Sequence, residues 1–211
     1  METAISKTAI LGAIAVAMTA SGCGGTRTTT SHRSSPTTPH AQTRSFAAAG
    51  PGSAFAWLRP APAPRAWQVA RIAGGAVLRY PPGWRRLTGD AGTVTAVLQS
   101  AGHDFLGYLN LTPRQGDETL STWASFRTRH NTLEGDRSVT ELGAATGLRF
   151  RNGHGSCVRD AYTTGTGARY IELACLVQGA RAAFVIVGAA PPRMWASIAP
   201  KIERAISAFP T

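Results

Sequence analysis

The pattern of apolar and polar positions divides the chain into three parts. An uncharged apolar run lies within residues 1–22, a segment rich in Ser, Thr and Pro fills 23–64, and alternating or periodic apolar patterns fill 65–211. The last part is long enough to bury one hydrophobic core, so it predicts a single domain. The middle part has few large apolar residues and cannot offset the entropy lost on folding, so it predicts a disordered tether. Its exception is the Phe-Ala-Trp-Leu cluster at 55–58, which is apolar enough to dock back onto the domain.

The first half of the domain predicts four strands followed by a helix. The runs at 67–72, 76–80, 93–99 and 105–111 are β-prone, and the last alternates with the period of two that marks a half-buried strand. We expect the helix to begin with Asp117 as its N-cap and to end at Glu134-Gly135. The side chains that recur on its one apolar face are Leu120, Trp123, Phe126 and His130.

A meander of hairpins is predicted after this helix. Asn152-Gly153, which follows the run 148–151, is the strongest two-residue hairpin signal because both positions favour positive φ. The next two strands are expected at 155–163 and 169–177, joined through a Gly-Thr-Gly turn.

The last two elements complete an α+β architecture. The continuous apolar run at 182–189 is typical of a central strand. Residues 193–209 carry apolar side chains at helical spacing, and Pro200 inside them predicts a kink or a restart. The fold class is therefore a largely antiparallel β-sheet with two main helices.

Two cysteines test the register of the second hairpin. If Thr166 is its centre, Cys157 lies directly opposite Cys175. Opposed side chains in an antiparallel pair lie close enough for a disulfide. We therefore predict a Cys157–Cys175 bridge, with two reduced, buried thiols as the alternative if the protein is not exported.

The same register sorts polar residues onto one face of the hairpin. Asp160, Tyr162, Tyr170 and Glu172 share that face, and they lie on the side opposite the two cysteines. From the neighbouring strand and its turn, Arg149 and Arg151 complete the set. We interpret this set as a candidate face for a ligand or a partner. A solvated face held by cross-strand pairs is the other interpretation.

The apolar run at the start of the chain predicts export. Residues 8–20 are too short to span a bilayer and fit the core of a secretory signal. The sequence Ala20-Ser21-Gly22-Cys23 resembles the lipobox of bacterial lipoproteins, and that resemblance implies a diacylglycerol on Cys23 and anchoring to the outer surface of the cell membrane. Ordinary cleavage with a free Cys23 and an uncleaved anchor stay open as alternatives.

The positive charge of the chain predicts a second attraction to the cell envelope, besides the lipid anchor. The net charge is +11, and arginines recur along the tether, which carries no acidic residue. Such a segment is attracted to anionic lipid or to an anionic wall polymer. A GC-rich genome would also favour arginine, so part of this charge needs no partner. Nucleic acid is disfavoured as a partner, because the chain is predicted to be exported and has no basic recognition helix.

One family matches the order of these elements. The turn Tyr80-Pro81-Pro82-Gly83-Trp84 after a short strand, a strand run, a helix with Leu120 and Trp123, further hairpins and a closing helix resemble the PsbP-like α/β/α sandwich. The resemblance spans most of the domain and implies a non-catalytic accessory or binding domain. It transfers no functional residue.

The sequence gives little support to catalysis. His103 and His154 are the histidines that a hydrolase would use, and Ser156 lacks the flanking glycines of a nucleophile elbow. The sequence also contains no HExxH motif, paired CxxC motif or phosphate-binding glycine loop, so it predicts neither a metal nor a cofactor.

Three functional hypotheses remain. The first is an envelope lipoprotein whose domain engages another envelope protein. The second is a module that binds an anionic ligand or wall polymer through Arg149, Arg151, Arg159 and Arg169. The third is the hydrolase.

Overall fold

The computed structural model describes residues 54–210. Two helices and nine strands form along this part of the chain. Their bounds are β1 Gln68–Arg71, β2 Val77–Tyr80, β3 Arg85–Leu87, β4 Val94–Gln99, β5 Phe105–Pro113, α1 Trp123–Leu133, β6 Arg137–Phe150, β7 Gly153–Thr163, β8 Arg169–Gln178, β9 Ala183–Ala190 and α2 Pro192–Ser207.

Seven antiparallel strands make the main sheet, in the order β3-β4-β5-β9-β8-β7-β6, and β1 and β2 form a separate hairpin. β9 occupies the middle of the sheet, and nearly all of its residues are buried. The apolar run that predicted a central strand is therefore confirmed, because both faces of β9 are covered.

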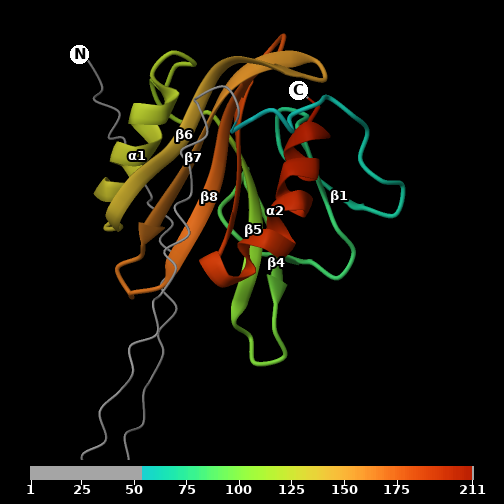
Figure 1. Cartoon of the computed structure of the whole chain (residues 1–211). Coiled ribbons are helices and arrows are strands. Elements are labelled where there is room, and N and C mark those ends of the chain that lie inside the picture. The colour runs from blue at the N-terminus through green and yellow to red at the C-terminus, as the bar shows by residue number, and fades with distance from the viewer. Residues whose placement is uncertain (1–53, 211) are drawn as a thin grey trace, which may run out of the picture. The chain divides into compact units, whose positions relative to one another are not determined.

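A helix covers each face of this sheet. α1 packs on the face that carries Val158, Ala174 and Val187. α2 packs on the opposite face, with the β1–β2 hairpin, over Cys157, Cys175 and the core side chains around them. Figure 1 shows the two helices on opposite sides of the strands. The α+β class and the α/β/α sandwich are confirmed.

The closing helix lies unusually close to the sheet. A Cβ added at Gly107 of β5 would come within 2.8 Å of Ile198, and one added at Gly188 of β9 would collide with Ile202. Glycine at these two positions lets the apolar stripe of α2 approach the strands directly. The predicted restart at Pro200 does not occur, because α2 runs from Pro192 to Ser207 without a break and Pro200 lies on its exposed side. The alternative, a kink at Pro200, stays a prediction.

The hairpin register agrees with the prediction. Cys157 pairs with Cys175 and Tyr162 with Tyr170 in the β7–β8 ladder. The two cysteines form a disulfide with their Cα atoms 4.1 Å apart, and both are buried.

Two local predictions were wrong. Gly153 pairs with Phe150 as the first residue of β7, so the turn residues are Arg151 and Asn152 and neither has positive φ. α1 begins at Trp123, six residues after Asp117, with Thr122 at the N-cap position. The neighbour of Asp117 explains this, because the Glu118 carboxylate accepts hydrogen bonds from the backbone of the preceding loop and holds it outside the helix.

The domain core begins before residue 65. Phe55 and Leu58 are buried with the α2-side core, at 3% and 6% exposure. Further along, the Ala61 N–H donates to the Ser207 carbonyl and Arg204 donates to the Pro62 carbonyl. The expected docking of 55–58 is confirmed, and the folded unit includes residues that we had assigned to the tether. The tether between Gly24 and Ser53, like Cys23 and the signal segment, lies outside the described residues.

Neither described helix is long and apolar enough to cross a bilayer.

If Phe55 belongs to the core, Phe55→Ala should lower the free energy of unfolding by about 3–5 kcal/mol, because it removes a buried aromatic ring. Val69→Ala is the control, since Val69 is 44% exposed and should cost less than about 1 kcal/mol. Urea denaturation followed by tryptophan fluorescence measures both. Equal, small effects would show that 54–58 does not contribute to the stability of the domain.

Candidate functional site

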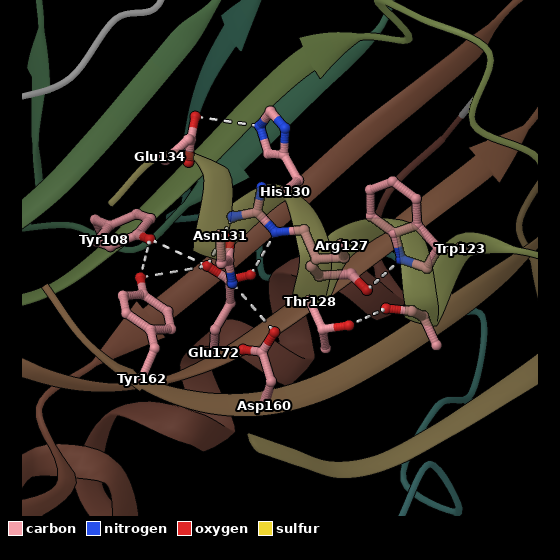
Figure 2. Close-up of polar contacts among 12 residues, drawn as sticks. Tyr108, Trp123, Arg127, Thr128, His130, Asn131, Glu134, Asp160, Tyr162 and Glu172 are labelled. Carbon is pink, nitrogen blue, oxygen red and sulfur yellow. Dashed lines mark hydrogen bonds and ion pairs between the residues drawn. The ribbon is translucent and has the colours of Figure 1, made fainter. Parts of the chain in front are cut away.

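The polar face of the β7–β8 hairpin lies beneath α1. Arg127 of α1 reaches Glu172 of β8 in a bidentate pair, with Nε 2.7 Å from Oε1 and Nη2 2.9 Å from Oε2. The Glu172 side chain is fully buried and that of Arg127 is 14% exposed. Burial alone would lower the pKa of Arg127, but the Glu172 carboxylate raises it above its usual range. Figure 2 shows Arg127 extending from α1 to this carboxylate.

Two phenols complete the environment of Glu172. The hydroxyl oxygens of Tyr108 on β5 and Tyr162 on β7 lie 3.2 Å apart, and each hydroxyl lies 3.4 Å from Glu172 Oε2. Burial, followed by the negative charge of Glu172, raises the pKa of Tyr108. Burial and then Tyr108 and Glu172 raise the pKa of Tyr162. Both phenols therefore stay protonated and act as hydrogen-bond donors.

A second carboxyl group lies beside the first. Asp160 pairs directly with Glu172 across the β7–β8 ladder, is fully buried, and accepts a 3.2 Å hydrogen bond from Asn131 Nδ2 of α1. Burial and then the nearby Glu172 carboxylate raise the pKa of Asp160 to about 8. Its Oδ1 atom has no hydrogen-bond partner among the residues that the structure describes. The cluster thus has one arginine for two buried carboxyl groups. Its charges balance when Asp160 is protonated and neutral.

This arrangement corrects the predicted face. Asp160, Tyr162 and Glu172 are at most 8% exposed, so the face is neither open to a ligand nor solvated, because α1 covers it. Tyr170 is half-buried at its edge, with its ring 6.0 Å from that of Tyr162. Arg149 is exposed on β6 and Arg151 in the β6–β7 turn, and neither joins the buried cluster.

The sequence reading missed Tyr108, Arg127 and Asn131. Arg127 and Asn131 follow Trp123 at intervals of four, so they share the stripe of the helix that faces the sheet. That spacing is a signal in the sequence. We described the helix by the face of Leu120, Trp123, Phe126 and His130, and so we left Arg127 and Asn131 out.

The other candidate residues do not gather into one site. Arg149 pairs with His154 on the α1 face, whereas Arg159 pairs with Leu173 on the opposite face, so the four arginines cannot form one anion-binding patch. His103 lies in the β4–β5 turn and His154 near the β6–β7 turn. Within residues 54–210 no group of His, Cys, Asp and Glu side chains is arranged to hold a metal ion.

A pocket of about 230 Å³ opens beside α1. Val185 of β9 and the end of β5 line it, and Arg127 of the buried cluster also contributes to the lining. The loop before α1 closes the other side, where Glu118 is only 5% exposed and accepts hydrogen bonds from the backbone N–H groups of Gln115 and Gly116. The full lining is Thr112, Pro113, Gln115, Gly116, Glu118, Trp123, Phe126, Arg127, His130 and Val185.

The border between α1 and β6 is the second notable surface. β6 is an edge strand of the sheet and packs against α1. Leu133, in the last turn of α1, is 75% exposed, and Leu142 of β6 is 41% exposed. Two of the three large apolar side chains that are exposed in residues 54–210 therefore lie on these two adjoining elements.

Comparison with known proteins bears on the fold alone. The sequence matches no protein-family model, and no curated protein sequence matches it. The solution structure of PsbP from the cyanobacterium Synechocystis sp. PCC 6803 superposes with a TM-score of 0.50 at 16% identity, over 69% of this chain and 92% of that chain. The fold is PsbP-like. LpqN, a Mycobacterium tuberculosis protein involved in cell envelope biogenesis, has a TM-score of 0.45 at 12% identity, over 68% of this chain and 88% of that one. The likeness to the PsbP structure confirms the predicted PsbP-like architecture.

The Arg127–Glu172 pair generates a stability prediction. Arg127→Met leaves the Glu172 carboxylate buried without its counter-charge, so we expect the free energy of unfolding to fall by about 3–5 kcal/mol at neutral pH. Arg129→Met is the matched control on the exposed side of the same helix and should change it by less than about 0.5 kcal/mol. Chemical denaturation compares the two, and similar effects would contradict the assigned role of Arg127.

Asp160 predicts a dependence of stability on pH. Its pKa is about 8 in the folded protein and about 3.9 in an unfolded chain, so the folded state holds a proton that the unfolded state releases. The contribution of Asp160 is therefore complete below about pH 4, falls as the pH rises towards 8, and is constant above that. Asp160→Asn removes this term.

The measurement is the free energy of unfolding of the protein minus that of Asp160→Asn, taken at several pH values. Subtraction cancels the titrations that both share, including that of Asp136, whose pKa is raised to about 6 chiefly by burial. We expect the difference to decrease steadily from pH 4 to pH 8. A difference that is constant or increases with pH would mean that Asp160 is ionised in the fold.

Proposed function

We propose that this protein is a cell-envelope lipoprotein, anchored to the membrane through Cys23, whose domain is non-catalytic and engages another envelope protein. The observation that carries the binding role is that two exposed leucines, Leu133 at the end of α1 and Leu142 on the edge strand β6, lie on elements that pack against each other. Exposed apolar groups beside unpaired strand edges favour association with another chain.

The cluster under α1 supports a structural contribution to this role. Its polar side chains bind one another: Arg127 binds Glu172, and Asn131 binds Asp160. They fix α1 on the sheet, and with it the helix end that carries Leu133. A rigid surface loses less conformational entropy on binding, which favours affinity.

The exported location rests on the lipobox-like sequence ending at Cys23 and on the buried disulfide, which is stable in an oxidising compartment. An anionic wall polymer is the alternative partner for the basic tether. The domain's four candidate arginines do not favour it, because Arg149 and Arg159 lie on opposite faces of the sheet.

Site-specific photocrosslinking in intact cells tests the partner. A photoreactive phenylalanine analogue in place of Leu133 should give a discrete protein adduct, and the same analogue in place of Val69, which is also exposed, should not. Leu142→Asp added to the Leu133 probe should reduce the adduct several-fold. An absent adduct, or the same adducts from both positions, would contradict the proposed surface.

The anchor is tested in the same cells with Cys23→Ser. We expect the protein to leave the membrane fraction and to lose the mass of its acyl chains. Retention of the variant in the membrane would contradict anchoring through Cys23 and would leave the crosslinking result intact.

A further inference from the structure

The pocket beside α1 is separate from the α1–β6 border. Its ionisable side chains limit the kind of ligand that it can bind. Each ionisable side chain in its lining already has a partner within the protein. Arg127 is paired with Glu172, His130 Nε2 lies 3.1 Å from Glu134 Oε1, and Glu118 is bound by two backbone N–H groups. These three side chains thus find hydrogen-bonding partners within the protein and do not depend on an ion from solution.

Hydrogen-bonding capacity nevertheless remains at the pocket. Among residues 54–210, the Thr112 hydroxyl, the Gln115 side-chain amide and Nη1 of Arg127 make no hydrogen bond with another protein group. None of these three groups is closed off from solvent, since none belongs to the buried atoms that lack a partner. The pocket thus offers both donors and acceptors to an incoming molecule. A wholly apolar ligand would leave them unsatisfied, which opposes its binding.

The remaining wall is aromatic. Trp123, Phe126 and His130 stack in sequence along α1, with ring centroids 5.9 and 5.7 Å apart. Because these rings stack on one another, they cover part of each other's faces, and the wall offers apolar aromatic carbon against which the C–H groups of a saturated ring can be buried. Below them, Pro113 and Val185 add apolar surface.

We infer that this pocket binds a neutral sugar ring. Such a ring presents C–H groups to the aromatic and apolar walls, and its hydroxyl groups donate and accept hydrogen bonds at the rim. It carries no charge that would compete for the existing partners of Arg127, His130 and Glu118. The cavity volume of about 230 Å³ lies below the roughly 300–1,000 Å³ of pockets for drug-sized ligands, so it has room for one ring of a longer glycan. This site goes beyond the proposed protein partner and does not depend on it.

The orientation of Arg127 is what connects the pocket to the buried cluster. Glu172 holds Nε and Nη2 of the guanidinium, so the remaining nitrogen is fixed in direction and can donate to a ring hydroxyl without further ordering. On the opposite side, the Gly116 backbone approaches Glu118 so closely that a Cβ would lie 2.9 Å from Oε2. The loop that carries Gln115 is thereby kept in place.

The test is a titration of the folded protein with neutral methyl glycosides (the glucoside, galactoside and mannoside) and with N-acetylglucosamine, followed by amide NMR shifts. We expect at least one of them to cause saturable shifts confined to residues 112–118 and 123–130. Gln115→Ala, at an exposed rim position, should weaken that binding about three- to tenfold, and Gln68→Ala, on β1 at the α2 side, should leave it unchanged.

Two results would overturn the inference. One is the absence of saturable shifts with every neutral sugar at tens of millimolar. The other is tighter binding of inorganic phosphate or glucuronate than of any neutral sugar at the same residues, which would show a charge-selective site.

Three further binding experiments distinguish the source of the sugar. Cosedimentation with purified wall glycan that the free glycoside competes away would identify a polymer. Competed binding to vesicles that contain a neutral glycolipid would identify a lipid headgroup. Saturable binding of the glycoside with neither of these would identify a free saccharide.

Discussion

The placement of α1 depends on one buried charge pair. Without a counter-charge, a fully buried carboxylate such as Glu172 would cost several kilocalories per mole. Arg127 supplies that charge in bidentate geometry from the middle of α1. Two further contacts tie the same helix to the sheet, because Trp123 Nε1 donates to the Ala174 carbonyl and Asn131 donates to Asp160. The helix therefore cannot shift along the sheet without exposing or unpairing a buried polar group.

Both candidate surfaces follow from this constraint. The wall of the pocket is the side of α1 that carries Phe126, Arg127 and His130, and the border with β6 is set by where α1 ends at Leu133. The opposite face of the sheet is held by apolar packing, with α2 lying directly on Gly107 and Gly188. One face of the sandwich thus provides stability through close apolar packing, and the other carries the groups that we assign to binding.

Much of the fold could be predicted because its strands and helices follow from local sequence patterns, and because two cysteines gave an independent check on one strand pairing. A turn centred on Thr166 predicted the register of the β7–β8 hairpin, and the pairing of Cys157 with Cys175 supported it. That register places Asp160 opposite Glu172 on one face. The apolar run of β9 identified a central strand. The covering of the polar face could not be predicted, because which helix packs on which face is decided by contacts between residues distant in sequence, such as Arg127 and Glu172. The errors at Asp117 and Gly153 have a local origin: hydrogen bonds of the Glu118 carboxylate and of the β6–β7 ladder overrode the intrinsic preferences of single residues.

A double-mutant cycle on Arg127 and Glu172 tests the central claim most directly. Free energies of unfolding would be measured for Arg127→Met, for Glu172→Met and for the two combined, at one pH and salt concentration. If the pair is the constraint on α1, the combined variant should lose much less than the sum of the single losses, with a coupling energy of about 2 kcal/mol or more. Additive losses, within about 0.5 kcal/mol, would show that the two side chains stabilise the fold independently and would contradict the account.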